Sequence, residues 1–210
     1  LVPLIQRVTA HADRVDDTPL HADFPIPIQR EFSDFVMGVM GIDRNHCIIG
    51  ETEHPFTINF SRDDVRITTH YHADMVASSL YSVVHEGGHA LYELGADDCY
   101  NYTALAGGVS MGIHESQSRF YENIIGRSRA FCSVIYPWLK EHFAPRLDNV
   151  TEDDFYRMIN KSEPSLIRTE ADELTYCLHI MIRYELEKAF MNGEITVDEI
   201  PALWNQKYQG

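Results

Sequence analysis

Basic residues are scarce in this chain, and long apolar stretches are absent from it. Lysine and arginine together number 17, against 32 aspartates and glutamates, which gives a formal net charge of −15. Phosphate backbones and anionic bilayers would repel such a chain, so we expect neither a nucleic-acid partner nor a membrane partner. A transmembrane helix requires roughly 20 consecutive apolar residues, and the sequence contains no such run.

Cysteine is also sparse. The four cysteines, at positions 47, 99, 132 and 177, are widely separated and never form a Cys-x-x-Cys pair. This pattern disfavours both a disulfide framework and a zinc–thiolate site, and it fits free thiols in a reducing compartment. Residues 1–5 are apolar, but they are neither preceded by a basic region nor followed by a small-residue cleavage site. We therefore expect a cytoplasmic protein.

The hydrophobic periodicity predicts a mainly α fold with one small sheet. Three short β-branched stretches between residues 47 and 71 predict a small, antiparallel sheet. The chain lacks internal repeats and low-complexity tracts, so we expect a single domain over residues 1–210. Apolar residues recur at helical spacing in the segments 27–40, 73–94, 113 onward, 131–142, 152–160, 166–190 and 198–208.

The helix predicted to follow the sheet carries the run His85-Glu86-Gly87-Gly88-His89. His85 and His89 lie one turn apart on the same face, where both imidazoles can bind one zinc-like ion. Glu86 is next to that face, where it can hold a water molecule and take its proton. By itself the pattern is moderately specific, because unrelated core histidines also produce it.

The two adjacent glycines need an explanation, since each buried glycine costs a helix about 1 kcal/mol relative to alanine. Gly87 and Gly88 leave the helix surface bare, which predicts that an extended substrate backbone or a neighbouring strand lies against it. The preceding strands, which end at residues 66–69, are the expected partner, because a sheet edge can bind a peptide by strand addition. Water activation beside such an edge indicates peptide-bond hydrolysis.

A third ligand must come from another element, because a catalytic zinc site has three protein ligands and keeps one position for water. Glu115 is favoured by its position at the start of the next predicted helix, which a helix–loop–helix hairpin returns to the metal face. Glu122 and Glu93 are competing carboxylates. The alternative for Glu115 is a solvated carboxylate that binds no metal and only stabilises the N-terminus of its helix.

Five motifs occur in a fixed order along the middle of the chain. They are HPF (54–56), DVRIT (64–68), HEGGH (85–89), HESQ (114–117) and IRTEAD (167–172). They resemble the HPF, DxRxT, HExxH, HESQ and IRxxAD signatures of the carboxypeptidase Taq family of metallocarboxypeptidases. Five ordered motifs are far more specific than an isolated HExxH.

The resemblance implies a helical, zincin-like catalytic core with a small sheet before the HExxH helix. It implies a metal-dependent carboxypeptidase that removes C-terminal residues from peptides with a free C-terminal carboxylate. One zinc ion per chain is expected, with cobalt as the alternative metal. The full-length protein is expected to be a cytoplasmic homodimer.

The resemblance also implies roles for the metal-site residues. His85, His89 and Glu115 are expected to bind the metal, and Glu86 is expected to be the general base. His114 is expected to lie beside the site, where it contacts substrate or supports the ligands.

Three further residues are expected to bind or order the substrate. Arg168 is expected to bind the terminal carboxylate, because arginine pairs with that group through two hydrogen bonds. An ordinary ion pair with a nearby acid is the alternative for Arg168. His54 and Arg66 are expected to order the site.

The chain also departs from the family pattern. It corresponds to the middle of longer family chains, and the C-terminal signature GxxQDxHW is absent. We therefore expect residues 1–210 to be a catalytic-core fragment. The alternative is a helical fragment that binds a metal or a peptide without turnover, because the N- and C-terminal parts of the groove are missing. A related endopeptidase or dipeptidase would share the HExxH chemistry, whereas a di-iron site lacks the second helical Glu-x-x-His it requires.

Overall fold

A computed structural model describes residues 1–209 and divides the chain into two compact units. The larger unit spans Asp16–Ile159, and the smaller one combines Leu1–Val15 with the segment from Asn160 onward. Two compact units can belong to one domain, so the single domain over residues 1–210 stays a prediction.

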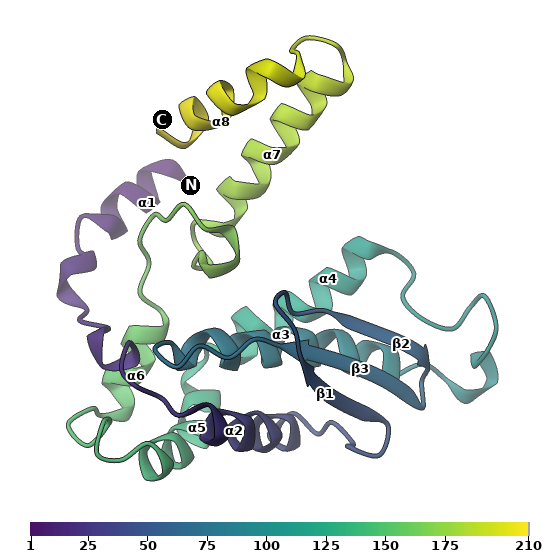
Figure 1. Cartoon of the computed structure of the whole chain (residues 1–210), viewed down its shortest axis with the longest axis vertical. Helices are drawn as coiled ribbons and strands as arrows, with labels where there is room; N and C mark the ends of the chain where they lie inside the picture. Colours follow the sequence, from purple (N-terminus) through teal and green to yellow (C-terminus); the bar gives the residue numbers. More distant parts are fainter. Residues whose placement is uncertain (210) are drawn as a thin grey trace. The chain divides into compact units, whose positions relative to one another are not determined.

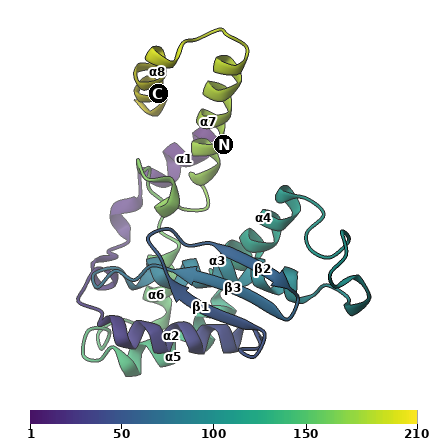
Figure 2. The ribbon, with the colours of Figure 1, turned by 45° about the vertical axis from the view of Figure 1, so that its right-hand side comes forward.

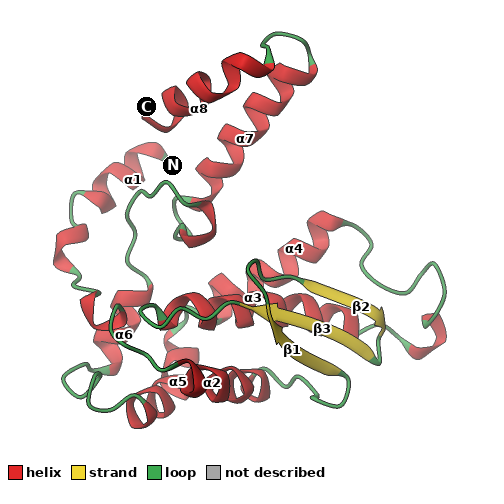
Figure 3. Cartoon of the chain, in the orientation of Figure 1, coloured by secondary structure: helices red, strands yellow, loops and turns green. Residues whose placement is uncertain are grey.

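The mainly α fold predicted from the sequence is confirmed (Figure 1), and Figure 3 separates the helices from the small sheet. No helix within residues 1–209 combines the length and the apolar character needed to cross a membrane. In chain order the helices and strands are α1 (Val2–Thr9), α2 (Ile26–Val39), β1 (Cys47–Glu51), β2 (Thr57–Ser61), β3 (Asp64–Thr69), α3 (Val76–Leu94), α4 (Met111–Arg119), α5 (Arg129–His142), α6 (Glu152–Ile159), α7 (Tyr176–Met191) and α8 (Ile200–Gln209).

The sheet is mixed, which corrects the prediction of an antiparallel sheet. Its strand order is β1-β3-β2. Strands β2 and β3 form the expected antiparallel pair, but β1 and β3 run parallel. The connection at residues 52–56 carries the chain from β1 past the position that β3 then fills, so the last strand becomes the central one.

Helix α3 is the central element of the larger unit. It packs against the sheet through β3, and also against α2 and α4 (Figures 1 and 2). Its apolar stripe recurs at helical spacing, and Val76, Leu80, Val83 and Val84 are all at most 2% exposed. The face of β3 that carries Val65 and Ile67 is buried in the same core. This packing holds the polar residues of α3 at fixed positions.

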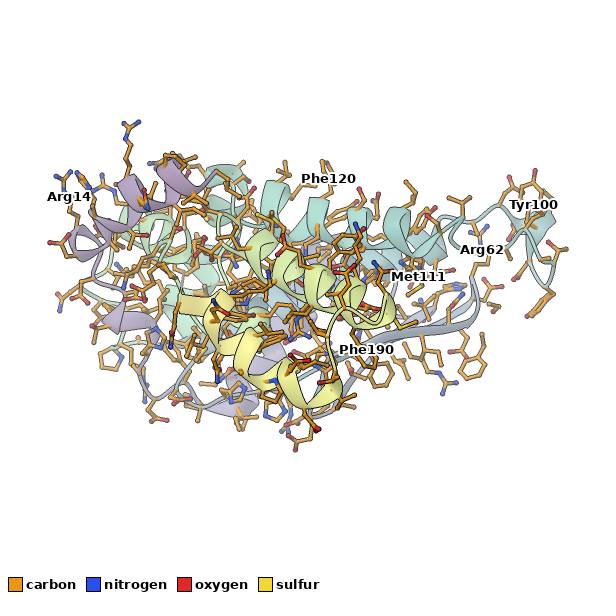
Figure 4. The ribbon with its side chains drawn as sticks, turned by 90° about the horizontal axis from the view of Figure 1, so that it is seen from above. Arg14, Arg62, Tyr100, Met111, Phe120 and Phe190 are labelled. Carbon is orange, nitrogen blue, oxygen red and sulfur yellow. The ribbon has the colours of Figure 1, made fainter. Side chains whose placement is uncertain are left out.

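The far end of the larger unit is formed by the β2–β3 turn and the segment after α3. Arg62 in the turn pairs with Asp98 at 2.9 Å. Figure 4 shows Arg62 and Tyr100 together at this end, while Met111 and Phe120 mark the two ends of α4. The ion pair fixes the start of the α3–α4 connection close to the sheet.

In the smaller unit, the predicted helix over residues 166–190 is wrong in its first ten residues. Helix α7 begins only at Tyr176, and Arg168–Glu170 forms a short 3₁₀ turn. The Asp172 carboxylate accepts hydrogen bonds from the backbone N–H groups of Leu174 and Thr175. Such local bonds compete with helical ones, so the helix starts after them.

Helices α7 and α8 of the smaller unit pack on each other through polar and aromatic side chains. Nδ1 of His179 lies 2.8 Å from the Tyr208 hydroxyl, and the Arg183 guanidinium lies 5.0 Å from the Trp204 ring centroid. The last helix starts close to the predicted position, and Thr196 and a following glutamate form a capping box at the short 3₁₀ turn that leads into it.

Candidate metal centre

The structure brings together the three residues predicted to bind a metal. The ligand atoms of His85, His89 and Glu115 all lie within 4.8 Å of one another. Oε2 of Glu115 is 3.5 Å from Nε2 of His85 and 3.3 Å from Nε2 of His89. Two imidazole nitrogens and one carboxylate oxygen are the donor set of a catalytic zinc site with an open position. The residues present therefore fit a zinc-like ion.

The other ring nitrogen of His85 is held by a second carboxylate. Nδ1 of His85 lies 2.7 Å from Oε2 of Glu122, which belongs to the π-helical segment Phe120–Ile125 that continues α4. Arg119 pairs with both Glu122, at 2.9 Å, and Glu115, at 3.2 Å. Glu122 thus orients His85 from outside the ligand set, an arrangement typical of metal-binding histidines.

The other ring nitrogen of His89 faces a histidine instead. Nδ1 of His89 lies 2.6 Å from Nδ1 of His114, and Nε2 of His114 lies 2.6 Å from Oε1 of Glu93. Glu93 is 6% exposed, and its second oxygen accepts a hydrogen bond from the Asn59 amide at 2.8 Å. His114 therefore lies beside His89, one of the predicted ligands, whereas Glu93 is one step further away.

The carboxylates of this cluster favour a positive charge between them. Burial opposes protonation of His85, but hydrogen bonds to Glu115 and Glu122 outweigh it and raise the pKa of His85 to about 9. Burial also opposes ionisation of both carboxylates, yet their histidine and arginine partners lower the pKa of each. The cluster is thus arranged to hold a cation.

Glu86, the expected general base, is buried on α3 between the predicted ligands in sequence, and a residue of the sheet binds its carboxylate. It is 6% exposed, and Oε2 of its carboxylate lies 2.5 Å from the Thr57 hydroxyl, which donates to it. This contact fixes one carboxylate oxygen of Glu86. Thr57 lies on β2, at the edge of the sheet.

The prediction about the paired glycines is wrong, because protein side chains and backbone fill the space beside them. Added to Gly87, a methyl group would lie 2.7 Å from Cε of Met40. Added to Gly88, it would lie 2.8 Å from Cα of Ser118, which is fully buried. The glycines therefore let the core and α4 approach α3, and the close approach at Gly88 places Glu115, one turn before Ser118, against the histidines.

Of the preceding strands predicted to offer a sheet edge, the one that ends at residues 66–69 is not an edge strand. This strand is β3, and both of its edges are paired, with β1 and with β2. The edge strand that contacts α3 near the metal site is β2, through Thr57 and Asn59. Our sequence reasoning missed both residues. Thr57 and Asn59 are two residues apart on a predicted strand, so the sequence could have indicated that both polar side chains lie on the same face of the sheet.

The residues predicted to bind or order substrate are not all near the ligands. Arg66 is exposed and pairs with Asp64 through two hydrogen bonds of 2.8 Å. His54 is exposed, and its carbonyl accepts a hydrogen bond from the Thr52 hydroxyl. Strand alternation places Arg66 on the sheet face opposite to the buried Val65, away from α3. The roles of Arg66 and His54 stay predictions.

Arg168, the expected partner of the substrate carboxylate, belongs to the smaller unit. Its guanidinium donates a hydrogen bond to the Tyr176 hydroxyl and lies 5.6 Å from the centre of that ring. These contacts hold Arg168 at the start of α7. Its role toward substrate stays a prediction.

The close approach at Gly88 gives a test of how the third ligand is positioned. We expect Gly88→Ala to lower the free energy of unfolding by about 1–3 kcal/mol, because an added methyl group overpacks a filled site. We also expect weaker metal binding, because α4 must move and Glu115 moves with it. Chemical denaturation and a metal titration measure the two effects.

Gly38 provides the matched control, because a methyl group added there meets no atom within 4 Å. It lies in α2, so Gly38→Ala should gain up to about 1 kcal/mol from helix propensity and leave metal binding unchanged. If Gly88→Ala were as stabilising as Gly38→Ala, the close packing of α3 and α4 would not position Glu115.

Comparison with known proteins extends the match beyond these motifs. The model of the carboxypeptidase Taq (M32) metallopeptidase family matches residues 1–210. Carboxypeptidase 1 of Bacillus subtilis is 44% identical over 209 residues, covering 100% of this chain and 42% of that protein. Thermostable carboxypeptidase 1 of Thermus thermophilus is 41% identical over 206 residues, covering 98% of this chain and 40% of that protein.

Solved structures give the same result. The M32 carboxypeptidase from Deinococcus radiodurans R1 is 41% identical and superimposes with a TM-score of 0.95, covering 99% of this chain and 42% of that one. A Pyrococcus furiosus carboxypeptidase is 40% identical, with a TM-score of 0.92 and coverage of 99% and 42%. The chain thus spans about 42% of the length of these structures. The family model matches all 210 residues of the chain, so the chain belongs to the carboxypeptidase Taq (M32) family of metallopeptidases.

Proposed function

We propose that this chain is the catalytic core of a metal-dependent carboxypeptidase that hydrolyses C-terminal residues from peptides. The observation that carries the proposal is the convergence of His85, His89 and Glu115 within 4.8 Å, with the buried carboxylate of Glu86 beside them. We propose one zinc ion per chain, because imidazole and carboxylate ligands suit zinc, with cobalt as the alternative.

The proposed chemistry is hydrolysis by an activated water molecule. When bound to the three ligands, a divalent ion lowers the pKa of a water molecule and polarises the scissile carbonyl. Oε1 of Glu86 takes a proton from a water molecule whose oxygen adds to the scissile carbonyl carbon, while the Thr57 hydroxyl holds Oε2 in place. Glu86 then gives this proton to the nitrogen of the leaving amino acid, so that the C–N bond breaks and the carboxylate is regenerated.

The specificity for C-terminal residues is assigned to Arg168. Its guanidinium is a suitable partner for a free carboxylate, which it can bind through two parallel hydrogen bonds. His114 contacts the substrate or supports His89, and Arg66 and His54 order the site. The substrates are therefore peptides with a free C-terminal carboxylate.

We further propose that the full-length protein is a cytoplasmic homodimer. Free cysteines suit a reducing compartment, and Cys47, Cys99, Cys132 and Cys177 are all unpaired. The homodimer rests on the resemblance to the family alone. The net charge of −15 argues against a nucleic-acid partner.

The proposal is tested with peptides that differ only at their C-terminus. We expect the zinc- or cobalt-loaded chain to release the last residue of a free-acid peptide and to act poorly on the matching C-terminal amide. We expect Arg168→Ala to lower kcat/KM for the free acid by about 10-fold or more, the loss of a hydrogen-bonded charge partner, and to change the amide little. Mass spectrometry of the products measures both.

Lys188→Ala is the control, since Lys188 is an exposed basic residue of α7 and has no assigned role. Equal losses on the acid and the amide would remove Arg168 from carboxylate recognition. Metal binding without any release of amino acid would favour the alternative function, a metal- or peptide-binding fragment. The share of the relatives' length that the chain spans, about 42%, is the observation behind that alternative.

A further inference from the structure

An unbroken series of hydrogen-bonded side chains runs from the sheet to one metal ligand. It begins at Asn59 on β2, continues through Glu93 near the end of α3 and His114 on α4, and reaches His89. The three contacts measure 2.8, 2.6 and 2.6 Å. The residues come from three separate elements, so the series is a feature of the tertiary fold rather than of one helix.

The donors and acceptors along this series can be assigned in one consistent order. The Asn59 amide donates to Glu93, whose ionised carboxylate only accepts. Nε2 of His114 must then carry the proton that it donates to Glu93. In neutral His114 the remaining nitrogen, Nδ1, accepts, and it accepts from Nδ1–H of His89. This order leaves the lone pair of His89 on Nε2, the atom that faces Glu115.

Two glycines of the α3–α4 connection pack closely on this series. A methyl group on Gly107 would lie 3.3 Å from Oε2 of Glu93, and one on Gly108 would lie 2.7 Å from Cδ2 of His114. Gly107 also has a φ of +95°, a conformation that suits glycine. The backbone therefore covers Glu93 and His114 directly, which holds both side chains in a fixed position.

A purely structural role explains Glu93 poorly. A buried carboxylate is costly to fold unless it is paired, and a buried polar pair often contributes no more to stability than well-packed apolar residues of similar volume would. Within residues 1–209, the side-chain partners recorded for Glu93 are an amide and an imidazole, neither of which carries a permanent charge. A role in fixing the tautomer of a metal-binding histidine would explain why Glu93 is a carboxylate.

We propose that Glu93, held by Asn59, is a positioning residue that acts through His114 to present Nε2 of His89 to the metal. The proposal rests on the metal site of the proposed function. Strand β2 then positions two carboxylates from one face. Thr57 binds Glu86, and Asn59 binds Glu93. One edge strand thus fixes both the general base and a metal ligand.

The test measures cobalt binding to the 210-residue chain, freed of metal and titrated with Co²⁺ against a competing chelator. We expect Glu93→Gln to weaken Co²⁺ binding by about 10–100-fold, the loss typical for outer partners of metal ligands. Asn59→Ala should weaken it by a smaller factor. Glu141→Gln, on an exposed residue of α5, and Ile58→Ala, on the exposed neighbour of Asn59, are controls and should bind as the parent does.

A double-mutant cycle tests whether Glu93 acts through His114, which we call the relay, or affects metal binding independently of His114. If Glu93 acts through His114, Glu93→Gln should cause no further loss of Co²⁺ affinity in a His114→Ala background. Losses that add up would overturn the proposal. In the zinc-loaded parent, ¹H–¹⁵N spectra of the histidine rings should place the proton on Nε2 of His114 and on Nδ1 of His89. The opposite tautomer at His114 would also overturn it.

The outcomes distinguish the two proposals. A parent chain that binds no Co²⁺ overturns the proposed function and the relay together. A parent that binds Co²⁺ as tightly as its folded Glu93→Gln variant overturns the relay alone. Should Glu93→Gln fail to fold by circular dichroism, Asn59→Ala decides, because Asn59 is on the exposed edge strand and unchanged affinity in that variant would exclude the relay.

Discussion

Replacing Glu86 by glutamine should stop peptide hydrolysis while the metal stays bound. The expected loss of kcat is about 10²–10⁴-fold, the usual contribution of a positioned general base. Glutamine keeps the size of the side chain and can still accept the hydrogen bond of the Thr57 hydroxyl. It cannot take a proton from water, so kcat and kcat/KM should fall together. Peptide cleavage and metal content per chain are the two measurements.

The matched control for this variant is Glu141→Gln, which makes the same chemical change on an exposed residue of α5. It should leave both kcat and metal content unchanged. Two results would remove Glu86 from the role of base. One is a variant that keeps most of its kcat, and the other is a variant that loses the metal, which would make Glu86 part of the ligand shell.

The parts of this site that the sequence predicted are those set by short-range geometry. Two histidines four residues apart on a helix must share a face, so the pairing of His85 and His89 required only that the segment be helical. Glu115 was predicted by position and motif, and it lies where expected. Of the competing carboxylates, Glu122 and Glu93 both lie near the site but contact His85 and His114 instead of joining the ligand cluster.

The failures at the paired glycines and in the sheet concern contacts between residues far apart in the chain. Gly87 and Gly88 were correctly marked as unusual, but a sequence pattern cannot say which part of the chain fills the space beside a glycine. Met40, at the end of α2, and Ser118, in α4, fill this space. The prediction of an antiparallel sheet failed for the same reason, because strand pairing depends on the path of the connections.

The misplaced start of α7 has a local cause that the periodic pattern hides. Apolar residues continue at helical spacing before Tyr176, so the pattern alone favours a longer helix. The side chain of Asp172 binds the backbone of Leu174 and Thr175, as well as the Ser162 hydroxyl. A side chain that satisfies backbone donors in this way delays the first helical turn. Sequence periodicity carries no information about this competition.

The second large effect is expected from Glu115→Ala, which removes one of three proposed ligands. We expect Zn²⁺ and Co²⁺ affinity to fall by more than the 10–100-fold that loss of an outer partner causes. The change also removes one of the two carboxylates that raise the pKa of His85, so that pKa should fall from about 9. Metal titration with a competing chelator measures the affinity, and histidine NMR of the metal-free chain measures the pKa.

Comparison with Glu122→Gln makes this prediction specific to the ligand role. Glu122 contacts Nδ1 of His85 and is not part of the cluster of predicted ligand atoms. Its replacement should therefore lower metal affinity by only about 10–100-fold. Ser116→Ala, on the exposed residue next to Glu115, should cost nothing. If Glu122→Gln weakened metal binding more than Glu115→Ala does, the two carboxylates would have exchanged roles, and the third ligand would come from the π-helical segment rather than from the first turns of α4.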